Sequence, residues 1–310
     1  MPLDPQISAF LKELSALDTK AIDQCTPDEF RTMIRVGSEV AGQLEAVGQI
    51  EGREIEGPDG AIGIRIYRPV DSTAQGAVVY YHGGGWVGGD LDTHDALCRA
   101  LANTASCMVV AVDYRLAPEH KYPAAAEDAY AAFTWVCEHS DELGIDSQKI
   151  AVCGDSAGGN LAAVVSLMAR DRKHLLPKVQ VLIYPITNFD FDTFSYAEYA
   201  EGYGLTTAGM KWFWQHYSPD ESEAVEPYAS PLNTDEFSGV SPAVVILAEY
   251  DVLRSEGEQY AARLQAANVS TVLKCYPGVI HGFVSRVNLF DAAREAVSQI
   301  AESLQKAFQT

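Results

Sequence analysis

The sequence predicts an α/β protein in which a mostly parallel central sheet is covered by helices on both faces. Three observations lead to this fold class. From residue 51 onwards, apolar runs of strand length alternate with helical patterns, as in proteins built on parallel sheets. The later runs are continuous and rich in valine, which is typical of strands buried on both faces. The chain has 310 residues, 47% of them hydrophobic and 21% charged, which suits one large α/β domain or two small ones.

Residues 1–48 precede the alternation and are predicted to form two helices. The second helix opens with a capping box, in which Thr26 caps the first turn and Glu29 completes the pair. In both helices the apolar residues recur at spacings that put them on one face. They are Ile7, Phe10, Leu11, Leu14 and Leu17 in the first helix, and Phe30, Met33, Ile34 and Val40 in the second.

The remaining elements follow in order along the chain. Strands are predicted at 62–67, 77–81, 108–112, 150–153, 179–184, 243–248 and 271–276. Helices are predicted at about 94–105, 123–140, 157–172, 255–268 and 288–307.

One segment breaks the alternation. Residues 186–225 carry ten aromatic side chains in forty positions, against 10% aromatic residues overall. A plain linker would not concentrate aromatic residues in this way, so we predict an inserted cap that covers an apolar pocket.

The predicted strand at 150–153 runs into the sequence Gly-Asp-Ser-Ala-Gly at 154–158 and then into a helix. A G-x-S-x-G turn between a strand and a helix exposes its serine hydroxyl, and the glycines are needed because the turn leaves no space for side chains. The turn also points the N–H of Ala157 at an oxygen that gains charge during attack. We therefore predict that Ser156 is a nucleophile.

Residues 82–86, with the sequence His-Gly-Gly-Gly-Trp, directly follow the second predicted strand. Glycines here let the chain turn two N–H groups, which we assign to Gly83 and Gly84, toward the same oxygen as the N–H of Ala157. These three groups form the predicted oxyanion hole. Trp86 is expected to form a wall of the substrate pocket.

A serine nucleophile needs a base, and the base needs a carboxylate that orients it. His281 lies after the last predicted strand, where the chain order of serine, acid and histidine places the base. Three carboxylates compete for the role of the acid. Glu249 lies close to the end of a strand and Glu256 begins a helix, so Asp251 is favoured.

Four motifs in this order carry a family resemblance. They are the sequences at 82–86, 113–119 (Asp-Tyr-Arg-Leu-Ala-Pro-Glu), 154–160 and 280–283 (Ile-His-Gly-Phe). With them the chain resembles the hormone-sensitive-lipase-like esterases, an α/β-hydrolase family.

The resemblance spans about residues 50–308 and implies a domain organisation. It implies an α/β-hydrolase catalytic domain at 49–310. The N-terminal helices at 1–48 and the inserted segment at about 186–225 would form a helical cap.

The resemblance also implies roles for single residues. Ser156, Asp251 and His281 fall on the catalytic triad of the family, and Gly83, Gly84 and Ala157 on its oxyanion hole. Trp86 and Asp155 are expected to contact substrate, and Asp113 and Arg115 to form a buried ion pair. One position departs from the family, because Val252 stands where members usually have proline after the acid, which frees one backbone dihedral.

The implied activity is that of a serine carboxylesterase acting on short- to medium-chain acyl esters through an acyl-enzyme, with no cofactor and no metal. The expected partner is a small ester substrate. A homodimer through the final strand and helix is an additional expectation from the family. The alternatives are a small-molecule receptor on the same fold, or a related hydrolase of amides, lactones or acetylated sugars.

Composition disfavours other classes of function. The chain carries 22 Lys and Arg against 43 Asp and Glu, a net charge of −21, and such a surface repels nucleic acids and anionic membranes. No basic and apolar leader opens the chain, and no run approaches the roughly 18 apolar residues of a membrane span. The six cysteines lack metal-binding spacing, so we expect reduced thiols and a cytoplasmic location.

Overall fold

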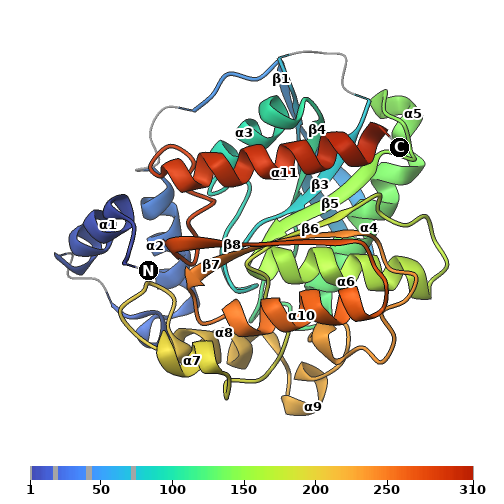
Figure 1. Ribbon diagram of the computed structural model, residues 1–310. Coiled ribbons are helices and arrows are strands. Elements are labelled where there is room, and N and C mark those ends of the chain that lie inside the picture. The colour runs from blue at the N-terminus through green and yellow to red at the C-terminus, as the bar shows by residue number, and fades with distance from the viewer. Residues whose placement is uncertain (1, 17–19, 40–43, 71–74, 310) are drawn as a thin grey trace.

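The computed structural model describes residues 2–16, 20–39, 44–70 and 75–309. Its centre is one eight-stranded sheet (Figure 1). The strands are β1 (Gln49–Gly57), β2 (Gly60–Arg68), β3 (Ala77–Tyr81), β4 (Met108–Asp113), β5 (Ile150–Asp155), β6 (Gln180–Ile183), β7 (Ala243–Tyr250) and β8 (Thr271–Ile280). They lie in the order β1-β2-β4-β3-β5-β6-β7-β8. The pairs β1/β2 and β2/β4 are antiparallel and all others are parallel, which confirms the predicted fold class.

All seven predicted strands are present, but the sequence did not predict β1. This strand pairs with β2 from Gln49 opposite Arg68 to Gly57 opposite Gly60. Only Ile55 of its nine residues is buried, and charged residues occupy much of the rest. The strand forms because β2 supplies its hydrogen-bond partners, so it needs no apolar run of its own.

The five predicted helices are also present. The helices of the α/β region, as the structure has them, are α3 (Asp95–Ala105), α4 (Ala124–Glu138), α5 (Ser140–Leu143), α6 (Ala157–Asp171), α10 (Arg254–Ala266) and α11 (Asp291–Gln309). The predicted helix at 123–140 is divided between α4 and α5 at His139. In Figure 1, α3 and α11 lie on one side of the sheet, and α6 and α10 on the other.

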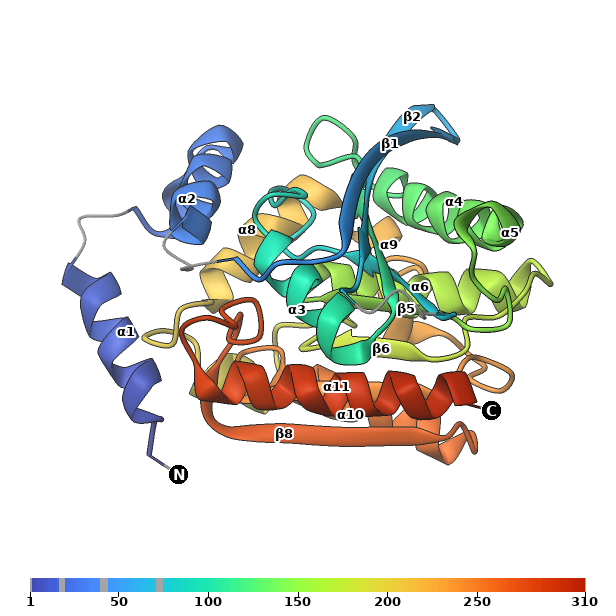
Figure 2. The same ribbon diagram turned by 90° about the horizontal axis from the view of Figure 1, so that it is seen from above.

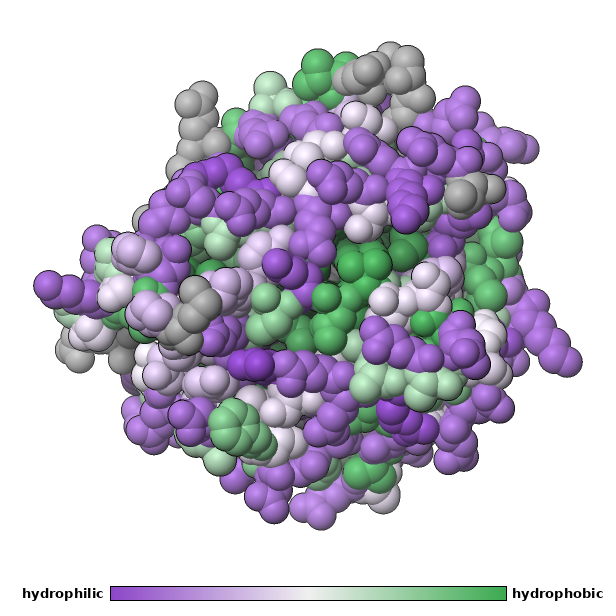
Figure 3. Space-filling model, in the orientation of Figure 1, coloured by the Kyte–Doolittle hydropathy of each residue, from purple (hydrophilic) through white to green (hydrophobic). Residues whose placement is uncertain are grey.

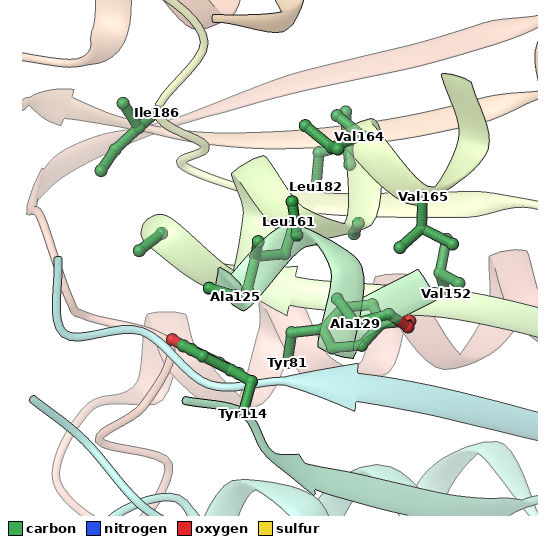
Figure 4. Packing of buried hydrophobic residues seen from close by; sticks show 14 of the residues in the cluster. Tyr81, Tyr114, Ala125, Ala129, Val152, Leu161, Val164, Val165, Leu182 and Ile186 are labelled. Atoms are coloured by element: carbon green, nitrogen blue, oxygen red, sulfur yellow. The ribbon is translucent and has the colours of Figure 1, made fainter. Parts of the chain in front are cut away.

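Side-chain alternation along the strands divides the core into two layers. Val79 and Tyr81 of β3 pack with α4, α6 and α10, whereas Val78 and Tyr80 pack with α3 and α11. Figure 4 shows the first layer, in which the ring of Tyr81 lies beside α4. The sheet is therefore covered on both faces, and the carboxyl ends of its parallel strands face the segments that carry the functional residues.

The N-terminal region contains α1 (Pro5–Ala16), a 3₁₀ turn (Ile22–Gln24) and α2 (Pro27–Glu39). Figure 2 shows α1 and α2 on one side of the molecule, with α5 on the opposite side. The predicted capping box forms, because the N–H of Thr26 donates to the Glu29 carboxylate (2.9 Å) and the N–H of Glu29 to the Thr26 hydroxyl (3.3 Å). Leu17 and Val40 of the predicted apolar stripes lie outside the described residues.

The aromatic-rich segment forms the short helices α7 (Phe194–Glu198), α8 (Thr207–Tyr217) and α9 (Glu221–Ala224). It packs against the N-terminal region through rings. Phe30 of α2 lies 5.6 Å from Trp212 and 5.1 Å from Phe213 of α8, measured between ring centroids. The two segments expected to form a cap therefore contact each other.

One expected ion pair is wrong. Asp113 is exposed at the end of β4, and Arg115 pairs with the buried Asp128 of α4 at 2.7 Å and with Asp59 at 2.9 Å. Arg115 lies beyond the end of β4, in the loop onto which α4 packs, so its guanidinium meets Asp128 of that helix. Across the four described ranges, no helix is long and apolar enough to cross a membrane.

Candidate active site

Ser156 occupies the turn between β5 and α6 in a strained conformation. Its φ is 57° and its ψ −117°, a combination that costs roughly 1–3 kcal/mol for a residue other than glycine. The turn is tight enough to require glycine on both sides. A Cβ at Gly154 would lie 2.2 Å from the carbonyl oxygen of Gly158, and a Cβ at Gly158 would lie 1.9 Å from that of Tyr81.

Ser156, His281 and Asp251 form one chain of hydrogen bonds. The Nε2 of His281 lies 3.0 Å from the Oγ of Ser156, and its Nδ1 lies 2.7 Å from the Oδ2 of Asp251. Asp251 is only 2% exposed, and its other oxygen accepts the N–H of Leu253 at 3.0 Å. The structure thus joins three residues that the sequence places 125 and 30 positions apart.

The two competing carboxylates have other partners. Glu249 accepts the N–H of Gly278 at 2.7 Å. Glu256 accepts the N–H groups of Thr187 (2.5 Å) and Asn188 (3.2 Å). Burial raises the pKa of Glu256 to about 8, against the two backbone hydrogen bonds, which lower it. Its carboxyl therefore favours the neutral form at pH 7 and lacks the charge that an acid partner of a histidine provides.

The glycine loop differs from the expectation at one position. The N–H of Gly83 donates to the Oδ1 of Asp155 at 2.9 Å, so it points away from the serine and is wrongly assigned to the oxyanion hole. Within the described residues, the backbone N–H groups of Gly84 and Gly85 donate to no protein acceptor. The φ angles of these two residues are 118° and 60°. The N–H of Ala157 opens α6, so it has no acceptor within that helix.

Asp155, expected from the sequence to contact substrate, lies among buried groups of the protein. Its side chain is buried, and its Oδ1 accepts from the hydroxyl of Tyr80 (2.6 Å) and from Gly83, with the Nε2 of His94 at 3.3 Å. Burial favours its protonated form, but the charge and hydrogen bond of His94 and the hydrogen bond of Tyr80 outweigh burial, so the pKa of Asp155 is lowered. All three partners meet Oδ1, so this oxygen of the carboxylate is occupied by groups of the protein.

Trp86 also departs from its expected place. Its side chain is fully buried, and its ring stacks on that of Tyr217 at 3.9 Å and lies 4.9 Å from that of Trp214. The indole therefore joins the glycine loop to α8 instead of forming an open pocket wall. Trp86 is buried because α8 packs against it. The residues around Trp86 in the sequence do not indicate this contact.

His94 contacts both Asp155 and Gly83 beside the candidate site, and the sequence did not single it out. It immediately precedes α3, and no local sequence motif there points to the active site. In the described residues, no group of three or more His, Cys, Asp or Glu side chains could hold a metal ion.

Several known proteins resemble this chain over most of its length. A family model described as the alpha/beta hydrolase fold matches residues 78–285. The carboxylic ester hydrolase LipN of Mycobacterium tuberculosis is 44% identical over 256 residues, which cover 81% of this chain and 68% of the relative. The ethyl acetate hydrolase of Pseudomonas putida is 36% identical, with 99% of each chain covered. A solved hyperthermophilic esterase from the archaeon Pyrobaculum calidifontis has a TM-score of 0.94, 47% identity and 99% coverage of each chain.

Proposed function

This chain belongs to the α/β-hydrolase family and is a carboxylic ester hydrolase of its hormone-sensitive-lipase-like group, and we propose that Ser156, His281 and Asp251 are its catalytic triad. The observation that carries the proposal is the hydrogen-bond chain from Ser156 through His281 to Asp251, at 3.0 and 2.7 Å. These distances allow a proton to pass from the serine to the imidazole without rearrangement.

The proposed reaction proceeds in two halves. The Oγ of Ser156 attacks the ester carbonyl carbon while its proton passes to the Nε2 of His281. The ester C–O bond then breaks, the imidazolium protonates the leaving oxygen, and an alcohol departs from the acyl-enzyme. Water attacks the acyl carbon, gives its proton to His281, and the acid leaves as the proton returns to Ser156. Asp251 stabilises the imidazolium in both halves.

We propose that the oxyanion is held by the N–H groups of Gly84, Gly85 and Ala157. Gly84 and Gly85 follow Gly83, whose own N–H is bound to Asp155. Ala157 stands at the N-terminus of α6, where the helix dipole favours negative charge. Three preorganised donors stabilise the tetrahedral intermediate because the charge appears where they already point.

The proposed substrates are esters with short to medium acyl chains. Support comes from aromatic rings that crowd the glycine loop from both cap segments. A Cβ at Gly85 would lie 2.1 Å from the ring of Phe213, and a Cβ at Gly88 would lie 2.9 Å from that of Phe30. We accordingly propose residues 1–48 and about 186–225 as a cap. The relative named ethyl acetate hydrolase also supports short chains.

Two further points are proposals. The six cysteines are all unpaired, which supports a reducing, cytoplasmic location. The long edge strand β8 supports a homodimer. No particular contact in the described residues favours the receptor, amidase, lactonase or deacetylase alternatives.

The test is hydrolysis of p-nitrophenyl esters of increasing acyl length by the purified protein, by Ser156→Ala and by Ser298→Ala. Ser298 lies exposed on α11 and is a control for the loss of a serine hydroxyl. We expect rates that peak at short chains and a fall of about 10⁶-fold in kcat for Ser156→Ala only. Comparable activity of Ser156→Ala would refute the nucleophile, and a peak at long chains would refute the substrate class.

A further inference from the structure

Behind the glycine loop lies a buried polar network that the proposed reaction does not use directly. It centres on the Oδ1 of Asp155, with Asp155 itself only 4% exposed. Three groups from separate parts of the chain meet this one oxygen. They are the hydroxyl of Tyr80 in β3 at 2.6 Å, the N–H of Gly83 at 2.9 Å, and the Nε2 of His94 at 3.3 Å.

His94 is itself held in place. It immediately precedes α3, and its Nδ1 lies 2.9 Å from the hydroxyl of Thr93. That hydroxyl in turn bonds to the backbone of Asp90. The Nε2 of His94 also lies 3.3 Å from the nitrogen of Gly83, so the imidazole touches both the carboxylate and the loop.

Gly83, the first glycine of the loop, lies so close to the Asp155 carboxylate that no side chain fits between them. A Cβ at Gly83 would lie 2.5 Å from the Oδ2 of Asp155, so any side chain there would displace the carboxylate. The network therefore fixes the peptide plane immediately before the two N–H groups that the oxyanion needs. Donors that stabilise an oxyanion must be placed to within about 0.5 Å.

We propose that His94 and Tyr80 are positioning residues for ester hydrolysis, because they fix the Asp155 carboxylate that aims the glycine loop at the oxyanion. This inference rests on the proposed function, since it requires Ser156 as nucleophile and the loop as oxyanion hole. The hydroxyl of Tyr80 and the imidazole of His94 touch no reacting atom. They act through Asp155 and the N–H of Gly83, so their loss weakens binding of the transition state more than binding of the substrate.

The strand β3 offers a matched control. Tyr80 and Tyr81 are adjacent, both are fully buried, and the hydroxyl of Tyr81 donates to the carbonyl oxygen of Ala129 at 2.8 Å on the opposite face of the sheet. Tyr80→Phe and Tyr81→Phe each remove one buried hydroxyl with one hydrogen bond. A purely structural role predicts the same kinetic effect for both.

The experiment measures kcat and KM on a short p-nitrophenyl ester, and the affinity for a trifluoromethyl ketone, which forms a tetrahedral oxyanion on the serine. For Tyr80→Phe we expect kcat to fall roughly 10-fold with KM nearly unchanged, and the affinity for the ketone to fall by the same factor. For Tyr81→Phe we expect kcat and the affinity for the ketone to stay within about 2-fold of the wild-type values.

His94 gives a second route, independent of the tyrosines. His94→Gln places an amide donor near Asp155 and should retain more of kcat than His94→Ala, with ketone affinity following in parallel. Equal effects of Tyr80→Phe and Tyr81→Phe, or a loss of kcat without a loss of ketone affinity, would overturn the inference. Ser156→Ala distinguishes a failure of this inference from a failure of the proposed function. Full activity of that variant would contradict the proposed function itself.

Discussion

Asp251 holds His281 by a single hydrogen bond of 2.7 Å, and valine replaces the proline that usually follows this acid in the family. The backbone freedom left by Val252 is removed in another way. The N–H of Leu253 donates to the side chain of Asp251, and the N–H of Arg254 to its carbonyl oxygen at 3.2 Å. These bonds close a tight turn, so the carboxylate is held without the proline.

A substitution tests the assignment of the acid. Asp251→Asn keeps the shape of the side chain but removes its charge and favours the wrong tautomer of His281, so we expect kcat to fall about 10⁴-fold. The control is Glu249→Gln, which changes a carboxylate on the same strand end whose partner is the N–H of Gly278. Its kcat should stay within a few-fold, and the reverse ranking of the two variants would show that the acid is misassigned.

Glu256 predicts a pH dependence of stability. Because burial raises the pKa of its carboxyl from 4.5 to about 8, the folded protein keeps a proton there that the unfolded chain loses above about pH 4.5. The contribution of Glu256 to the free energy of unfolding therefore falls as pH rises from about 4.5 to 8. The side chain of Glu256→Gln stays neutral, so the free energy of unfolding of this variant should rise by about 3 kcal/mol relative to that of the wild type between pH 5.5 and 8.

Urea unfolding at the two pH values measures this difference. The control is Glu258→Gln on the same helix, which removes a partly exposed ion pair with Arg254 and should shift stability by a similar amount at both pH values. A difference between Glu256→Gln and the wild type that does not change with pH would contradict a neutral carboxyl in the folded protein.

At the residue scale the sequence predicted the three residues that the structure joins by hydrogen bonds. Ser156, Asp251 and His281 stand at the ends of predicted strands, and chain order alone suggests their meeting. Gly83 was misassigned because the direction of a backbone N–H depends on dihedral angles and on buried partners, here Asp155 and the groups that hold its carboxylate. Those groups, Tyr80 and His94, come from other elements and carry no local signal.

At the scale of elements, the close approach of α6 to β3 positions the nucleophile. The first turn of α6 passes so near the backbone of Tyr81 that only glycine fits at position 158. Gly158→Ala should therefore lower the free energy of unfolding by about 3 kcal/mol. Gly37→Ala is the matched control, because Gly37 lies in α2 with no atom within 4 Å of its added Cβ, and alanine there should stabilise by about 0.5–1 kcal/mol.

Equilibrium denaturation of both variants checks the argument. A Gly158→Ala protein as stable as the wild type would mean that the helix can move away from β3. In that case the position of Ser156 would not depend on this contact.

Apolar patterning predicted elements well where they are buried and poorly where they are exposed. Six of the seven predicted strands have side chains that fill the two core layers. The seventh, at 271–276, was predicted from its apolar residues although Val272 and Leu273 are exposed at the edge of the sheet. β1 was missed because its pairing with β2 supplies hydrogen bonds without burying side chains, and hydrogen bonding leaves little trace in the sequence. The cap helices were anticipated only as an aromatic-rich segment, since aromatic rings pack in many geometries.

At the scale of the whole molecule, β8 ends the sheet and leaves one edge unpaired by other described strands. Val272 is 49% exposed and Leu273 40% exposed on this strand. Figure 3 shows apolar side chains gathered between α10 and α11, where this edge lies. Edge strands with exposed apolar residues favour pairing with another chain.

We therefore expect a dimer in light scattering after size exclusion, and a monomer for Val272→Lys. Val36→Lys is the control, because Val36 is 57% exposed on α2, far along the chain from β8, and should leave the dimer intact. A monomeric wild type, or a dimer that persists in Val272→Lys, would contradict the proposed interface.

The central claim is that the ester is cleaved through an acyl group carried on Ser156. The most direct measurement is rapid acid quenching during hydrolysis of a short p-nitrophenyl ester, followed by peptide mass spectrometry. The account predicts one acyl group per chain, located on the peptide that contains Ser156 and absent from Ser156→Ala. Continued turnover without any acylated peptide, or an acyl group on another residue, would contradict it.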